Sequence, residues 1–212
     1  MFYGENVKAL RNLYGMSRRH LGKVLSISEQ AVGQYENNSI QPEIMNILKL
    51  SRLFKVKSSF FFTKPLVEDV TNEEAIAYRS VNRNSRKNVR EGATQINFAS
   101  AIIDYCESFL TLQSNVIKQA VARTQKIESS NVLDRQEVIE QSASMARDLL
   151  KVNSNEDLLF YVENAGAYVF EKKLALNAGA YSAWTRFSDG SLKSPFIVLG
   201  VVGKSALRRI FD

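Results

Sequence analysis

The chain has 212 residues, of which 45% are hydrophobic and 24% are charged, and its formal net charge is +6. This length and composition fit one large or two small soluble domains, and no apolar run approaches the ~18–20 residues that cross a bilayer. The start, MFYGENVKALRNLYG, lacks the features of a signal peptide, and the single cysteine, Cys106, excludes an internal disulfide framework and fits a cytoplasmic protein without a membrane partner.

The positive charge lies at one end of the chain. Residues 1–65 contain ten Lys or Arg and four Glu, which accounts for the whole net charge, whereas the rest of the chain sums to zero. A small basic domain beside a neutral body indicates a polyanionic partner for the first part only. We therefore divide the sequence into residues 1–65, 66–128 and 129–212.

The first 65 residues are predicted to form a bundle of short helices. GENVKALRNLYG has its apolar residues on one helical face, and Ser17 can cap a second helix, RRHLGKVL. Ser28 can cap a third helix, EQAVGQYEN. Pro42 suits the first position of a fourth helix that runs to Phe54, and KVKSSFFF closes the bundle.

Two short helices joined by a tight turn in a basic bundle describe a helix-turn-helix. The stretch MSRRHLGKVLSISEQAVGQYENNSIQPEIMNILKLSRLFKV closely resembles the lambda-repressor-like (XRE-type) DNA-binding family, which implies a five-helix bundle over about residues 5–63. The residues that match are Ser17, Leu21, Leu25, Ile27, Ser28, Val32, Tyr35, Glu36, Asn37 and Pro42. Gly22, Gly33 and Asn38 depart from the family pattern, and Asn38 is expected to replace a turn glycine because Asn tolerates the left-handed conformation.

By geometry and by this resemblance, the third helix would enter the major groove of DNA with its N-terminal half against base edges. A glutamine pairs well with adenine and Ala31 suits a thymine methyl, whereas Glu29 would either read a cytosine amino group or repel wrong sequences. Because an exposed glutamine is more often only solvated, the assignment of base contacts to the glutamines rests on the helix-turn-helix motif. The expected base-reading residues are Ser28, Glu29, Gln30, Ala31 and Gln34, and the expected phosphate contacts are Arg11, Arg18, Asn37 and Asn38.

Residues 66–128 are predicted to form a helical linker. Thr71 and Glu74 have the spacing of a capping box before a short helical segment. From Gly92 onward, apolar residues recur at helical spacing through residues 96–121, which indicates one helix of roughly eight turns with a polar break at Gln113. The apolar seam of this helix either packs on the C-terminal part or joins two chains in a dimer.

Residues 129–212 are predicted to be α+β. Asp134 with Glu137, and Ser154 with Asp157, would cap two helices. AYVFEKKL, AYSAWTRF and SPFIVLGVV have the period of strands, SDGS is a tight turn, and KSALRRIFD begins another helix. The predicted fold is therefore mainly α, with helices and a small antiparallel sheet in the C-terminal part.

The string ENAGAYVFEKKL…AYSAW…SPFIVLGVVGKSALRRIFD, preceded by YRSV…SRK, resembles the ImmA/IrrE-type metallopeptidase family. Many members carry an N-terminal XRE domain, and their last helix continues into a zinc-binding H-E-x-x-H motif. This sequence ends at Asp212, before that motif would begin. Because His20 is its only histidine and Cys106 its only cysteine, we expect no zinc site, no cofactor and no enzyme activity.

The sequence thus predicts a repressor of phage or mobile-element type that binds double-stranded operator DNA as a homodimer. Its C-terminal half would be a catalytically empty peptidase-like domain that senses a signal, dimerises, or binds an antirepressor or inducer. Two alternatives stay open. The chain could be the front part of a longer zinc-dependent regulator-protease, or an antitoxin that binds a toxin and represses its own operon.

Overall fold

The computed structural model describes residues 1–65, 67–78, 86–111, 116–129, 134–172 and 180–200. The chain is mainly helical and divides into two compact units. The first comprises Met1–Glu74 with Asn84–Ile102, and the second comprises Ala75–Arg83 with Ile103–Asp212. Within the described ranges, none of the helices is both long enough and apolar enough to cross a membrane.

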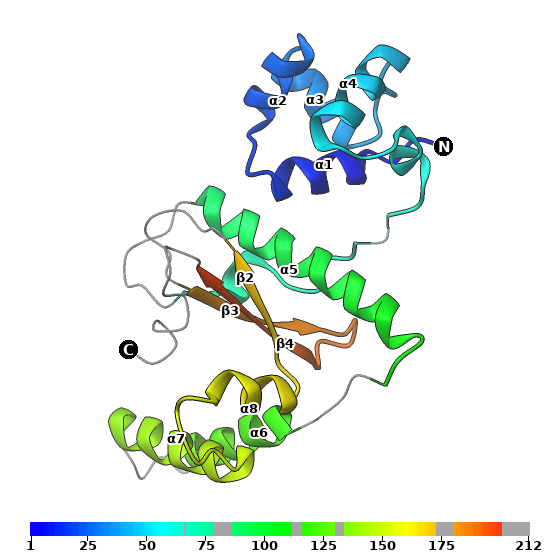
Figure 1. Ribbon diagram of the computed structural model, residues 1–212. Helices are drawn as coiled ribbons and strands as arrows, with labels where there is room; N and C mark the ends of the chain where they lie inside the picture. Colours follow the sequence, from blue (N-terminus) through cyan, green and yellow to red (C-terminus); the bar gives the residue numbers. More distant parts are fainter. Residues whose placement is uncertain (66, 79–85, 112–115, 130–133, 173–179, 201–212) are drawn as a thin grey trace. The chain divides into compact units, whose positions relative to one another are not determined.

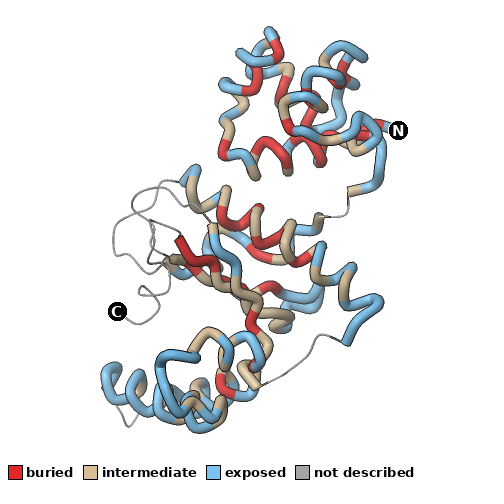
Figure 2. Tube along the Cα trace, in the orientation of Figure 1, coloured by how far each residue is buried: buried red, intermediate tan, exposed pale blue. Residues whose placement is uncertain are grey.

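The first unit opens with a bundle of four α-helices that a 3₁₀ helix closes, which confirms the five-helix prediction (Figure 1). The elements are α1 (Gly4–Leu13), α2 (Arg18–Leu25), α3 (Glu29–Glu36), α4 (Ile44–Phe54) and η1 (Ser58–Phe62). Every element contributes to one apolar core, visible as the inward-facing buried segments in Figure 2. The most deeply buried members are Val7, Leu21, Leu25, Val32, Leu50, Phe54 and Phe61.

The helix starts of this bundle follow the predicted caps with one exception. The Ser17 hydroxyl accepts a hydrogen bond from the amide of His20 at 3.1 Å, and Ser28 accepts one from Ala31 at 3.0 Å, so α2 and α3 begin as predicted. Pro42, however, lies outside α4, because Glu43 is in an extended conformation at the N-cap and the helix begins at Ile44. Proline therefore precedes the cap here and does not occupy the first helical turn.

The long helix α5 (Arg86–Glu107) begins in the first unit. Its buried face carries Ile96 and Asn97, and Phe98 packs against the apolar core of the bundle. The side chain of Asn97 accepts a hydrogen bond from the Thr71 amide at 3.0 Å and donates to Asp69 at 3.2 Å. Asn97 thereby holds the segment that follows the bundle.

Two predictions for the linker are wrong. The apolar seam does not form one continuous helix, because α5 starts six residues earlier than Gly92 and ends at Glu107, and α6 (Val116–Ser129) is a separate helix. Gln113 lies outside the described residues. Thr71 does not cap a helix either, since its hydroxyl has no hydrogen-bond partner within the described part of the chain and only a 3₁₀ turn, η2 (Glu73–Ala75), follows.

The second unit contains a four-stranded sheet in the order β1-β3-β4-β2. Its strands are β1 (Ala77–Tyr78), β2 (Tyr168–Lys172), β3 (Ala180–Arg186) and β4 (Leu192–Gly200). The β3–β4 pair is an antiparallel hairpin closed at the predicted turn, where Gly190 adopts a φ of +83°. β2 runs parallel to β4, so the sheet is mixed, whereas the sequence predicts an antiparallel one. Period-two patterning identifies strands but does not specify the direction in which they pair.

Helices complete the second unit. α7 (Arg135–Leu150) begins with the predicted capping box of Asp134 and Glu137, which is confirmed by reciprocal bonds of 2.9 and 3.0 Å. α8 (Leu158–Asn164) lacks the predicted cap, because Ser154 instead bonds the amide of Glu156 at 3.2 Å before the helix begins. The predicted helix KSALRRIFD lies outside the described residues.

Candidate nucleic-acid interface

The start of α3 presents a polar surface. Ser28, Glu29 and Gln30 are exposed, while Val32 and Tyr35 on the opposite face of the same helix are buried in the core. Because the Ser28 hydroxyl satisfies the Ala31 amide, the first turn of α3 is fixed and its outer side chains project from a rigid backbone. This is the geometry that a helix needs in order to present side chains to base edges.

The other two predicted reading residues are less accessible. Ala31 and Gln34 are half-buried, and Gly33 lies between them along the helix. The guanidinium of Arg18 lies over Gly33: a Cβ placed on this glycine would be 3.7 Å from Nη1. The exposed surface of α3 therefore centres on residues 28–30, and Gln34 lies at its edge.

The start of α2 supplies positive charge beside this surface. Ser17 caps the helix, and Arg19 and His20 are exposed in its first turn. The Arg18 side chain is 40% exposed. A capped helix N-terminus with cationic side chains is a favourable site for a phosphate group, since amide dipoles and charge act together.

A buried carboxylate ties these helices together. The side chain of Glu36, at the end of α3, is completely buried and is paired with Arg11 of α1 and Arg18 of α2. Arg18 Nε donates to Glu36 at 2.7 Å, Arg11 Nη2 donates to it at 3.2 Å, and Arg11 Nη1 donates to the Met16 carbonyl at 2.7 Å. Arg11 is thus a buried component of the domain, whereas Arg18 of α2 is half-buried and Arg19 is exposed.

The two asparagines after α3 differ in their surroundings. Asn37 is exposed. Asn38 has a φ of 59°, in the left-handed region, as its replacement of a turn glycine predicts. Its side chain accepts a hydrogen bond from the Gly4 amide at 2.6 Å and donates to Glu5 at 2.9 Å, which lowers the pKa of that carboxyl. Asn38 therefore ties the turn to the start of α1, and both asparagines are exposed.

Comparison with known families identifies the bundle. Residues 7–61 match the helix-turn-helix family. This part of the chain is a helix-turn-helix domain. A relative in Bacillus subtilis (strain 168) is named the SPbeta prophage-derived uncharacterized HTH-type transcriptional regulator YonR. It is 31% identical over 58 residues, which are 27% of this chain and 54% of the relative. This chain thus covers about half the length of that relative. No solved structure matches this chain significantly.

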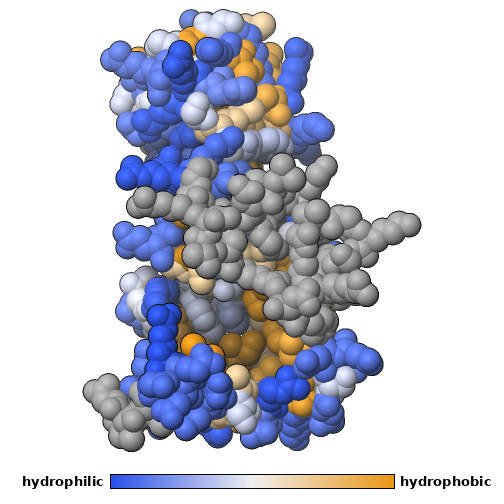
Figure 3. Space-filling model, turned by 90° about the vertical axis from the view of Figure 1, so that its left-hand side faces the viewer, coloured by the Kyte–Doolittle hydropathy of each residue, from blue (hydrophilic) through white to orange (hydrophobic). Residues whose placement is uncertain are grey.

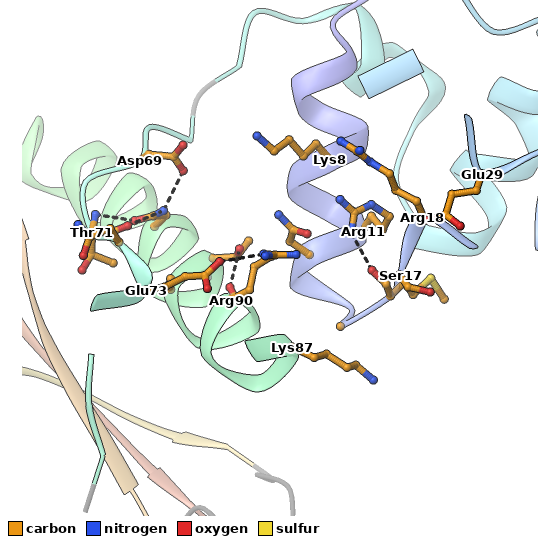
Figure 4. A pocket seen from close by; sticks show the side chains of 17 residues that line it. Lys8, Arg11, Ser17, Arg18, Glu29, Asp69, Thr71, Glu73, Lys87 and Arg90 are labelled. Carbon is orange, nitrogen blue, oxygen red and sulfur yellow. Dashed lines mark hydrogen bonds and ion pairs between the residues drawn. The ribbon is translucent and has the colours of Figure 1, made fainter. Parts of the chain in front are cut away.

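Beside the helix-turn-helix domain, the first unit contains a pocket that sequence reasoning missed (Figure 4). We call it the α1–α5 pocket. Its volume is about 760 Å³, and its walls come from α1, the start of α2, Glu29 of α3, the segment Asp69–Glu73 and the first half of α5. The residues on its two sides are up to about 90 positions apart in the sequence, so no local pattern could have indicated it.

Proposed function

We propose that this protein is a sequence-specific DNA-binding transcriptional repressor. The observation that carries the proposal is the exposed, capped start of α3 with Glu29 and Gln30 on its outer face, beside the exposed arginine of α2, Arg19. The helix-turn-helix match and the named transcriptional regulator among its relatives support it. In this proposal Ser28–Ala31 and Gln34 read bases, and Arg18, Arg19 and Asn37 hold phosphates.

We further propose that the protein binds operator DNA as a homodimer, since helix-turn-helix proteins read two half-sites through a two-fold axis. Apolar side chains near the end of α5 support this part. Ile102, Tyr105 and Phe109 recur at helical spacing and are exposed, the last two by 69% and 70%. Next to them around the helix, Ile103 and Cys106 are half-buried. The exposed stripe therefore borders a half-buried face of the same helix.

The second unit would receive the signal that releases repression. Figure 3 shows apolar surface gathered in a hollow of this unit. The exposed apolar residues of the unit as a whole include Ile139, Phe160 and Phe170. An exposed apolar surface of this kind is typical of a site that binds another protein. In this proposal the occupant is an antirepressor or inducer protein, and the unit serves as a peptidase-like scaffold without catalytic function.

The test is binding to the DNA upstream of the protein's own gene, compared with a random duplex over a range of salt concentrations. We expect protection of a two-fold-related site with an affinity about 10³-fold or more above that for random DNA. The specific affinity should also fall linearly with salt on logarithmic axes, because phosphate contacts release counterions. Equal affinity for both duplexes at every salt concentration would reject the proposal.

A further inference from the structure

The α1–α5 pocket has an excess of positive charge. Five cationic and three acidic side chains line it. Two of the acids already have partners, because Glu73 accepts from Arg90 at 2.9 Å and Asp69 accepts from Asn97 at 3.2 Å. On the opposite wall, Arg11 and Arg18 share the single carboxylate of Glu36, so two guanidinium groups face one negative charge.

Lysines extend this positive field at the opening. Lys8 of α1 and Lys87 of α5 are exposed and line the pocket from different elements (Figure 4). Each lysine ammonium group is a point charge on a flexible side chain, whereas the Arg18 guanidinium is fixed by its hydrogen bond to Glu36. Lys8 and Arg18 lie toward one end of the pocket and Lys87 lies toward the other (Figure 4), so Lys8 and Arg18 form the part suited to an anion that carries more than one negative charge.

Deeper in the pocket, polar atoms lack partners. Thr71 is only 7% exposed, and its hydroxyl has no hydrogen-bond partner among the residues that the structure describes. The same is true of the side-chain oxygen of Asn12. Buried polar atoms without a partner are costly and uncommon. A molecule that entered the pocket and let the Thr71 hydroxyl rotate toward it would remove this cost.

We propose that the α1–α5 pocket binds the phosphate group of a small phosphorylated molecule, and that this binding opposes binding to DNA. The phosphate would lie near Arg18 and Lys8, and the remainder of the molecule would extend toward Thr71 and Asn97. A volume of about 760 Å³ is in the range of small-molecule sites. The regulatory consequence rests on the proposed DNA-binding function, whereas the binding site itself does not.

Arg18 connects the pocket with the DNA-binding surface. It lines the pocket, lies over Gly33 of α3, and is a proposed phosphate contact for DNA. A phosphate bound in the pocket would use the charge that DNA needs. By linkage, DNA must then lower the affinity for the phosphorylated molecule by the same factor.

The first experiment measures the unfolding midpoint of the full chain without DNA. Inorganic phosphate and ribose 5-phosphate are titrated against sodium chloride and ribose at matched ionic strength. We expect both phosphates, and neither control, to raise the midpoint in a saturable manner. Lys8→Gln should raise the Kd for phosphate about three- to tenfold, and Lys126→Gln on α6, which is the same substitution outside the pocket, should leave the Kd unchanged.

Thr71→Val tests the deeper wall, because valine keeps the shape and removes the hydroxyl. Without phosphate we expect this variant to be at least as stable as the wild type, since it removes an unpartnered buried group, and its response to ribose 5-phosphate should be reduced. A midpoint that rises no more with phosphate than with chloride would overturn the proposal. An unchanged ribose 5-phosphate response in both variants would do so as well.

The second experiment repeats the DNA titration with and without ribose 5-phosphate. We expect the ligand to weaken DNA binding of the wild type, and to have a smaller effect on DNA binding of Lys8→Gln. If Lys8→Gln and Thr71→Val weaken DNA binding in phosphate-free buffer as much as they weaken phosphate binding, the pocket holds the DNA backbone and the small-molecule proposal is wrong. If the protein binds no specific DNA but the midpoint response persists, the site stands and only the repressor function fails.

Discussion

Glu36 joins the first three helices of the helix-turn-helix domain. Its carboxylate is fully buried, and it joins the last turn of α3 to Arg11 of α1 and Arg18 of α2. A buried carboxylate is tolerated only when its charge and its hydrogen-bonding capacity are satisfied, and here two guanidinium groups do both. Because the same Arg18 is partly exposed, one side chain both supports the domain and contributes to its surface charge.

Gln30 and Gln34 provide the most direct test of base reading. We expect Gln30→Ala to weaken binding to the specific site by about 1–3 kcal/mol, because the proposed bidentate contact to a base would be lost, and to leave binding to random DNA nearly unchanged. Gln34→Ala should have a smaller effect in the same direction, since Gln34 is half-buried. Fluorescence anisotropy on both duplexes measures this.

Arg19→Ala is the matched control for these variants. It removes an exposed positive charge in the first turn of α2 and should weaken binding to both duplexes alike, with a salt dependence that is less steep by about one unit. An equal loss on specific and random DNA for Gln30→Ala would contradict the assignment of base reading to α3.

At the scale of the elements, short sequence patterns predicted where helices begin, but they did not predict which residues far apart in the chain pair with each other. Ser17, Ser28 and Asp134 each cap a helix through a bond to an amide three residues ahead, so short sequence patterns are sufficient there. The parallel pairing of β2 with β4, and the pairing of Arg18 with Glu36, join positions far apart in the chain. Such pairs depend on the tertiary fold, which periodicity does not contain.

The two glycines of the helix-turn-helix are predicted to respond in opposite ways to alanine. At Gly33 a Cβ would meet Arg18 at an ordinary contact distance of 3.7 Å, so Gly33→Ala should stabilise the domain by about 0.5–1 kcal/mol through helix propensity. At Gly22 a Cβ would lie 2.8 Å from the Ile27 carbonyl oxygen, in a turn where the backbone has little room to move. Gly22→Ala should therefore destabilise the domain by about 1–2 kcal/mol.

Urea unfolding measures the free energy of unfolding of the two glycine variants, which can be compared if both show the same dependence of this free energy on urea concentration. Each variant is the control for the other, because the substitution is the same and both sites are in short helices of one domain. A destabilised Gly33→Ala would show that the close approach of Arg18 to α3 is tighter than the structure indicates. A stabilised Gly22→Ala would show that the turn before α3 can move away.

At the scale of the whole molecule, the linker region has two separate functions in our interpretation. The first part of α5 packs on the helix-turn-helix domain through Phe98 and lines the α1–α5 pocket. The stripe of Ile102 and Tyr105 in α5 and Phe109 in the turn after it is exposed. The sequence predicted an apolar seam here but could not separate the two faces, because the residues of both recur at nearly the same helical spacing.

The stripe makes a prediction about assembly. Phe109→Ser should weaken self-association about tenfold or more if the aromatic side chains lie at the centre of a dimer interface, since such residues carry most of the binding energy. Ile139→Ser on α7 is the matched control, because it also exchanges an exposed apolar side chain for serine. Sedimentation equilibrium of the full chain measures both variants.

Measurements of DNA binding then distinguish a loss of dimerisation from damage to the helix-turn-helix domain. Phe109→Ser should reduce affinity for a duplex with two half-sites spaced about 10 base pairs apart, and leave the weaker binding to a single half-site unchanged, because α3 is intact. If Phe109→Ser and Ile139→Ser associate as the wild type does, the stripe is not the dimer interface. A loss of single half-site binding in Phe109→Ser would instead mean that this residue supports the fold of the helix-turn-helix domain.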